Sequence, residues 1–95
     1  VYFWLKEEHQ NPADRAVFEQ GLESLFKIGL VKSGRWAVPA NVMPRPVIDQ
    51  SWQYALTMQF DSIEDQDAYQ NDADHHTFIN TFKEWWAKVL VMDLA

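Results

Sequence analysis

WQYALTMQFD, residues 52–61, alternates apolar side chains with small or polar ones along its whole length. The apolar positions are Trp52, Tyr54, Leu56, Met58 and Phe60, and the intervening ones are Gln53, Ala55, Thr57, Gln59 and Asp61. A period of two is typical of a β-strand with one face packed on a core. The segment therefore predicts a strand that is apolar on one face and small and polar on the other.

Three further segments are predicted to be strands. Residues 1–6, VYFWLK, are apolar on both alternating faces, which indicates a central strand buried on both sides. Residues 31–39 carry Trp36 and Val38 on one face and end at Pro39, whose missing amide hydrogen favours a place at the sheet edge. Residues 89–94 are again apolar on both faces and predict the last strand.

Helices are predicted between these strands. Asn11 and Pro12 form an N-cap and first turn, and the helix is expected to run to about Ile28 with one buried face. Gly21 is expected to allow close packing on the sheet; the alternative is that the helix merely tolerates it. That buried face carries Phe18, Leu22, Leu25 and Phe26, and Asp14, Glu19 and Glu23 are expected to face water. Ser62 caps a short helix over residues 63–70. A longer helix is expected from the polar turn at residues 71–74 to about Lys88.

The buried stripe of that longer helix follows helical spacing. It carries Phe78, Ile79, Phe82 and Trp86, and His75 lies on the same stripe one turn earlier. The resulting order is strand, helix, strand, strand, helix, strand. Because crossovers between parallel strands are right-handed, this order predicts an α+β, ferredoxin-like βαββαβ sandwich with a four-stranded antiparallel sheet and helices on one side. Residues 1–95 are expected to form one domain.

Aromatic residues are abundant, with five Trp, six Phe and three Tyr in 95 residues. If both helices cover one side of the sheet, the other side carries residues of the doubly apolar first and last strands. An exposed apolar patch of that size usually marks an association surface. We therefore expect a homodimer through the open sheet face, with a small hydrophobic ligand as a further possible partner. If the small, polar face of residues 52–61 points into the dimer, Gln53, Ala55, Thr57 and Gln59 would leave room and hydrogen-bonding groups for a ligand there. The alternative is that this is an ordinary exposed face.

Charge and composition exclude several classes of function. The formal net charge is −6 with no cluster of Lys and Arg, so neither nucleic acid nor an anionic membrane surface is expected as a partner. No apolar run is long enough to span a bilayer, and nothing at the start resembles a secretion signal. The absence of cysteine excludes disulfides and thiolate chemistry and favours a cytoplasmic location.

The chain resembles the stress-responsive A/B barrel (Dabb) family over its whole length. The matching segments, in order, are VYFWLK at 1–6, FEQGL at 18–22, VPA at 38–40, RPVID at 45–49, YAL at 54–56 and AYQNDADHHTFI at 68–79. The resemblance implies a ferredoxin-like protomer, a dimeric α/β barrel and a ligand cavity between sheet and helices. It also implies a small hydrophobic or aromatic ligand. Trp4, Phe26, Phe78, Phe82 and Trp86 are the residues predicted to line that ligand site.

One branch of this family is an aromatic polyketide cyclase that works without a metal, and it uses a Tyr and a His six residues apart. Tyr69 and His75 match those positions. A neutral His75 at a helix start is a possible base, and the Tyr69 hydroxyl can polarise a carbonyl. The simpler account is that His75 bonds to backbone groups at the connection and Tyr69 fills space.

Asp72, Asp74, His75 and His76 look like a metal cluster, because carboxylate and imidazole at close spacing can share a cation. The simpler account is stabilisation of a helix start by the two aspartates, so no metal and no cofactor are expected. Arg45, between two prolines, suits a salt bridge or an anionic ligand.

Two hypotheses follow. The first is a non-catalytic Dabb-type barrel of unsettled activity that binds a small hydrophobic or aromatic ligand, for which the resemblance suggests a role in stress response. The second is a cofactor-independent cyclase or lyase using Tyr69 and His75. A heme- or oxygen-using member of the wider superfamily is a third, without a distinctive ligand arrangement.

Overall fold

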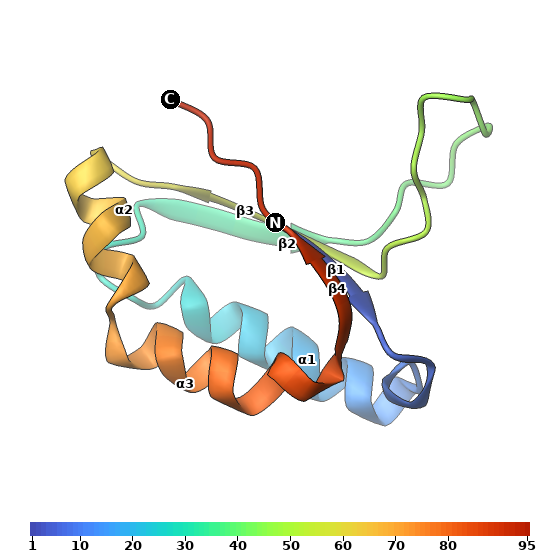
Figure 1. Cartoon of the computed structure of the whole chain (residues 1–95), viewed down its shortest axis with the longest axis horizontal. Helices are drawn as coiled ribbons and strands as arrows, with labels where there is room; N and C mark the ends of the chain where they lie inside the picture. The colour runs from blue at the N-terminus through green and yellow to red at the C-terminus, as the bar shows by residue number, and fades with distance from the viewer.

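A computed structural model describes all residues 1–95 as a four-stranded sheet with helices packed beneath it (Figure 1). The elements, in order, are β1 (Tyr2–Leu5), α1 (Pro12–Leu25), β2 (Ser33–Ala37), β3 (Tyr54–Gln59), α2 (Ile63–Gln70), α3 (Ala73–Phe82) and β4 (Trp86–Leu90). Short 3-10 turns, η1 (Glu7–His9) and η2 (Lys83–Trp85), follow β1 and α3. The predicted order of strands and helices is confirmed.

The strands lie in the order β2-β3-β1-β4, and every neighbouring pair is antiparallel. Tyr2 pairs with Ala55 of β3 and with Leu90 of β4, and Ala55 pairs with Ala37 of β2. Partners in an antiparallel ladder share a face, so these four residues lie on one side of the sheet. α1 and α3 lie on the other side, and α2 lies at the end of the sheet and leads to α3 (Figure 1). This is the predicted ferredoxin-like arrangement, with β2 at an edge as expected.

The alternation of β3 holds within the strand. Tyr54 and Leu56 are buried against the helices, while Ala55 faces the open side. Trp52 does not share the face of Tyr54, contrary to the prediction. It precedes the strand, donates its indole hydrogen to the carbonyl of Asp49 at 2.8 Å, and packs edge-on against Tyr2. The turn at Asp49 rotates this side chain before the extended geometry of β3 begins.

Two predicted strands are shorter and less buried than expected. In β1, Phe3 and Leu5 are buried and Tyr2 and Trp4 are only half-buried, so the strand is covered fully on one face alone. β2 ends at Ala37, and Val38 lies outside it and is 48% exposed. The prediction of burial on both faces was wrong for this chain by itself, because the helices cover only one side.

The last crossover ends earlier than predicted. α3 stops at Phe82, η2 follows, and Trp86 begins β4 instead of lying on the helix stripe. The backbone amide of Lys6 donates to the carbonyl of Trp85 at 2.8 Å, and Leu5 pairs with Trp86. These sheet contacts draw the chain into β4 about one helical turn early. The last strand is therefore Trp86–Leu90, not residues 89–94.

Aromatic rings form much of the core between sheet and helices. The buried residues are Phe3, Leu5, Phe18, Leu22, Leu25, Ile28, Val31, Tyr54, Leu56, Tyr69, Phe78 and Phe82. Gly21 of α1 lies directly against Phe82 of α3: a Cβ atom on Gly21 would lie 2.3 Å from Cε2 of that ring. Gly21 was predicted to pack closely on the sheet; close packing is present, but the prediction was wrong about the partner, which is α3.

The predicted helix caps are present. Asn11 and Ser62 each accept a hydrogen bond from a backbone amide three residues later, and Pro12 opens α1. The Asp72 carboxylate accepts from the amides of Asp74 and His75 and caps α3. Capping of this kind fixes the turn between α2 and α3, on which the candidate site depends.

Candidate functional site

Tyr69 and His75 meet at the turn between α2 and α3. Tyr69 is the second-last residue of α2, and His75 lies in the first turn of α3. Their rings stack with centroids 4.1 Å apart and planes inclined at 26°. Asp72 caps α3 between them, so the sequence places both side chains on the same side of one tight connection.

Burial keeps both groups uncharged near neutral pH. It lowers the pKa of His75, and the nearby carbonyls of Gln70 and Tyr69 oppose this shift only in part. Burial raises the pKa of Tyr69 well above its usual value, and the negative charge of Asp72 adds to that rise. The pair therefore presents a neutral imidazole and a neutral phenol.

One buried polar atom of the pair, Nδ1 of His75, has no hydrogen-bond partner. The carbonyls of Gln70 and Tyr69 lie near the same ring and act on its pKa, so the simpler account, in which His75 bonds to backbone groups of the connection, stays an alternative. A buried polar atom without a partner is unusual in native proteins and calls for an explanation.

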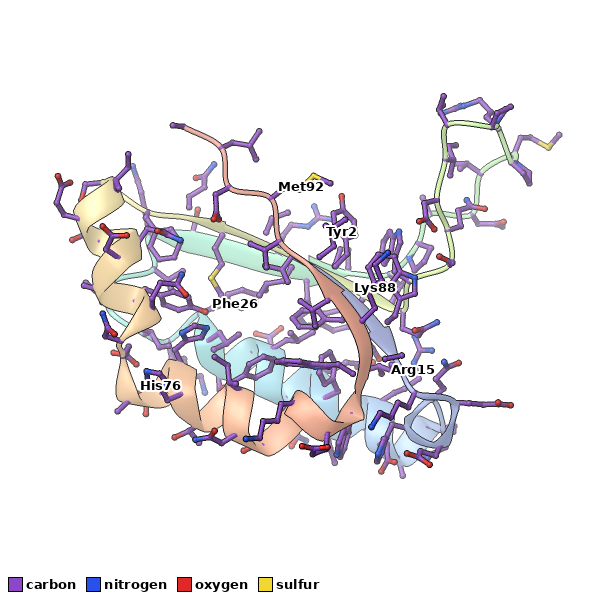
Figure 2. All side chains as sticks on the ribbon, viewed as in Figure 1. Tyr2, Arg15, Phe26, His76, Lys88 and Met92 are labelled. Carbon is purple, nitrogen blue, oxygen red and sulfur yellow. The ribbon has the colours of Figure 1, made fainter.

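The five predicted lining residues fall into three places. Phe78, Phe82 and Trp86 lie in one aromatic layer on the helix side: Phe78 is 5.2 Å from Phe82 and 6.1 Å from Trp86 between ring centroids. Phe26 is also on the helix side but lies over Gly34 of β2 (Figure 2). Trp4 lies on the open face, where Nζ of Lys88 sits 4.6 Å from its ring centroid. The structure therefore brings together three of the five.

Of five hollows at the surface, the two main ones do not touch Tyr69, His75 or the five lining residues. The larger, about 790 Å³, lies between the end of β3, the start of α2 and the C-terminal residues Met92–Ala95. The smaller, about 300 Å³, lies over β2 and β3. Phe60 lines the larger hollow and packs against Tyr69 at 5.2 Å, so only one ring separates that hollow from the pair.

A second polar cluster was missed by the sequence reasoning. Tyr54 of β3 donates a short hydrogen bond to the carboxylate of Glu19 and accepts one from Nε of Arg15 at 3.1 Å. Burial, and then the bond to Glu19, raise the pKa of Tyr54 to about 12, against the opposing effect of Arg15. Arg15 and Glu19 are four residues apart on α1, and that spacing was the available signal.

Glu19 and Glu23 were expected to face water; Glu23 is exposed as predicted and Glu19 is half-buried, and both accept hydrogen bonds from aromatic side chains of the sheet. Glu19 is half-buried at Tyr54, and Glu23 accepts the indole hydrogen of Trp36 at 2.8 Å. These contacts lock α1 onto β2 and β3. Because these hydrogen bonds join the helix to the sheet, the cluster has a structural role.

At the opposite end of the molecule, His9 stacks on Trp85 with 4.4 Å between centroids and lies 3.0 Å from the Asp14 carboxylate. His9 was not singled out from the sequence. The hydrogen bonds from His9 and Asn11 lower the pKa of Asp14. This contact joins the start of α1 to η2.

The face of the sheet opposite the helices is mixed in character. Its half-buried members are Tyr2, Trp4, Ala37, Ala55 and Leu90, and its exposed polar members are Ser33, Arg35, Thr57, Gln59 and Lys88. Residues 40–50 and the C-terminal residues rise from this same side (Figure 1), and Met92 is labelled there in Figure 2. Met43, Val47 and Leu94 within them are almost fully exposed apolar side chains.

No group of three or more His, Asp or Glu side chains is placed to hold a metal ion. Asp72 binds backbone amides of α3, as the simpler account of that segment predicted. None of the helices has both the length and the apolar character needed to cross a bilayer.

The topology and the uncovered sheet face define a class: ferredoxin-like α+β proteins in which helices cover one side of a four-stranded sheet. The family model of the Stress responsive A/B Barrel Domain (Dabb) matches residues 1–95. The chain belongs to this family, as its resemblance suggested.

The fold is similar to the crystal structure of the Arabidopsis thaliana protein At3g17210. The TM-score is 0.83 at 21% sequence identity, and the alignment covers 99% of this chain and 88% of that one. At this identity the likeness supports the fold and carries no statement about activity. No curated protein matches the sequence.

Proposed function

We propose that this chain forms a homodimeric barrel through its open sheet face and binds a small aromatic or hydrophobic ligand on the helix side. The binding site is the aromatic layer beside Tyr69 and His75. The observation that carries the proposal is the stacked, uncharged pair with an unpartnered Nδ1 in that layer. A role in stress tolerance in the cytoplasm fits the family and the absence of cysteine.

The dimer is argued from the character of the open face. Tyr2, Trp4 and Trp52 gather there with Ala37 and Ala55, and no element of the chain packs over them as the helices do on the other side (Figure 1). An aromatic centre with polar residues around it is the usual anatomy of a protein interface. A second sheet stacked on the first would complete a barrel, which is the architecture the family name describes.

The ligand site is argued from ring geometry. Phe3, Phe78 and Trp86 pack with centroid distances of 5.6 to 6.1 Å, and Tyr69 and His75 add two more ring faces one helical turn away. Such a layer suits a flat apolar molecule, because aromatic side chains supply large apolar area and defined geometry. The hollow beside Phe60 offers an approach to Tyr69 once that ring turns aside.

A cyclase or lyase is the second candidate, and the protonation states of the pair favour it. A neutral His75 can take a proton next to a carbonyl, and a protonated Tyr69 can donate a hydrogen bond to the developing oxyanion. No metal or cofactor enters this chemistry. The two candidates share one site and differ only in whether the bound molecule reacts.

The location of the ligand site can be tested with a neutral aromatic probe, N-phenyl-1-naphthylamine. We expect saturable fluorescence enhancement, and NMR shift changes at His75, Phe78 and Trp86. Shift changes confined to Ile63, Gln66 and Met92 would place the ligand in the surface hollow and overturn the proposed site. Native mass spectrometry of freshly purified protein reports subunit number and any retained molecule together.

Enzyme and binding protein can be separated by two conservative variants, Tyr69→Phe and His75→Phe. Both keep a ring in the stack, so we expect both to retain probe binding. If a molecule retained by the protein is converted, loss of turnover with retained binding supports the cyclase or lyase. Unchanged turnover in both variants excludes the pair from catalysis.

A further inference from the structure

Only two buried side-chain polar atoms in the chain have no hydrogen-bond partner: Nδ1 of His75 and Nε1 of Trp86. The contrast with other tryptophans is clear. Trp4, Trp36 and Trp52 each donate their indole hydrogen at 2.8 Å, to Ser51, Glu23 and the carbonyl of Asp49. The fold thus supplies acceptors for three of the five indole donors, and of the remaining two, Trp85 and Trp86, only Trp86 has a buried Nε1 without a partner.

Leaving a buried donor unpaired is costly. Removing such a group from water without compensation costs about 1–3 kcal/mol, and native proteins retain few of them. Trp86 begins β4, where its backbone pairs with Leu5, and its ring would lose its packing against Phe3 and Phe78 if it turned outward. A partner from outside the chain removes the penalty.

Both unpartnered atoms belong to one part of the helix-side layer. The Trp86 ring packs against Phe78, with centroids 6.1 Å apart, and Phe78 lies three residues after His75 on α3. Residues three apart on a helix share a face, so Phe78 and His75 both point toward the sheet. Trp86 also contacts Phe3 of β1, at 5.6 Å.

We propose that Trp86 is the residue that selects the ligand, through a hydrogen bond from Nε1–H to an acceptor atom carried by an aromatic molecule. An indole nitrogen donates and never accepts, so the ligand must present an acceptor, such as an aryl ketone oxygen. Nδ1 of His75 meets a second polar group of the same molecule. This inference rests on the proposed ligand site and narrows its ligands to aromatic carbonyl compounds.

The test compares two probes of nearly equal shape, acetophenone and α-methylstyrene, in which the ketone oxygen is replaced by a methylene group. A neutral hydrogen bond strengthens binding by about three- to ten-fold. The ratio of the two affinities is measured in wild type and in Trp86→Phe, so that the unequal hydrophobicity of the probes cancels. We expect the ratio of acetophenone affinity to α-methylstyrene affinity to be higher in wild type than in Trp86→Phe by that factor.

Trp85→Phe is the matched control, because Trp85 is the neighbouring indole and packs on His9 instead. It should leave the ratio unchanged. A second measurement covers the case in which Trp86→Phe folds poorly. In ¹H–¹⁵N spectra of the wild-type protein, acetophenone should move one indole signal downfield, and α-methylstyrene should not.

The outcomes separate this inference from the proposal on which it rests. If both probes bind and their ratio is the same with and without Trp86, the role of Trp86 is overturned and the ligand site stands. If acetophenone binds and no indole signal moves, the role of Trp86 is likewise overturned and the ligand site stands. If neither probe binds, the aromatic ligand site itself is overturned, and the selection by Trp86 falls with it.

Discussion

Tyr69 and His75 stack ring on ring, 4.1 Å apart between centroids, across a turn whose centre is the capping residue Asp72. Stacking of this kind excludes water from one face of each ring and favours the uncharged form of both. The contact also orients His75 so that its Nδ1 is buried without a partner. The chemistry of the site and its pH response both derive from this contact.

Acidification should weaken the fold through His75. Its pKa is lowered in the folded protein, so between that value and the unfolded value of about 6.5 the unfolded chain binds more protons. The contribution of neutral His75 to stability is therefore complete above about pH 6.5 and is lost as the pH falls through that window. The check is urea denaturation of wild type and His75→Phe between pH 7.5 and 5.

In that experiment, the difference in unfolding free energy between wild type and His75→Phe isolates the effect of His75. The N-terminal amine also has a lowered pKa, but it is present in both proteins, so its effect cancels. Asp14 and Asp49 have lowered pKa values too, which places their effect at more acidic pH. A pH dependence of equal slope in wild type and His75→Phe would contradict the burial of neutral His75.

Gly21→Ala should destabilise the protein, although alanine favours helices over glycine. The added Cβ would lie 2.3 Å from Cε2 of Phe82, whose ring is 4% exposed and packed against Phe18 and Trp85. We expect a loss of about 1–3 kcal/mol in the free energy of unfolding, as for other overpacked cores. Gly29→Ala is the control, because nothing lies within 4 Å of its Cβ position. Equal stability of the two variants would refute the close contact of α1 and α3.

Tyr54→Phe should cost about 1–3 kcal/mol, because it leaves the half-buried Glu19 carboxylate without its donor. A double-mutant cycle with Glu19→Gln in urea denaturation measures the coupling. We expect the double variant to lose less than the sum of the single losses. Strictly additive losses would show that the two side chains do not interact in solution.

Ala55→Arg should convert the proposed dimer to a monomer. Ala55 lies on the open face between Tyr2 and Ala37, so a long charged side chain there would be buried without a partner by a second sheet. Sedimentation velocity at high protein concentration is the measurement. Gln20→Arg, an equal charge change at an exposed position of α1, should leave the subunit number unaltered. A wild-type protein that is already monomeric at high concentration contradicts the dimer itself.

Short sequence patterns were enough to predict the elements that alternation, capping residues or helical spacing mark. The alternation in residues 54–59, the caps at Asn11, Ser62 and Asp72, and the apolar spacing of Phe18, Leu22 and Leu25 were all sufficient. The end of α3 was misjudged, because Trp86 continues the helical spacing of Phe78 and Phe82. Its place in β4 depends on pairing with Leu5, which is 81 residues away in the sequence and invisible to any short window.

Some residues of the candidate site could be predicted from the sequence, and others could not. Tyr69 and His75 could be singled out because the resemblance to the Dabb family implies a Tyr and a His at these two positions. Trp4 and Phe26 could not be assigned to their places, since alternation and helical spacing do not say which face of a sheet receives the helices. Tyr54, Glu19 and Arg15 were missed because their hydrogen bonds join β3 to α1 across 35 to 39 residues.

By itself, the sequence determined the order of strands and helices, the helix starts and the family, because these depend on periodicity, capping and residues close together along the chain. Only the tertiary structure decided which rings share a layer, which buried polar atoms remain unpartnered, and where α3 gives way to β4. Those outcomes depend on strand pairing and packing between residues far apart in sequence, and no local preference encodes them.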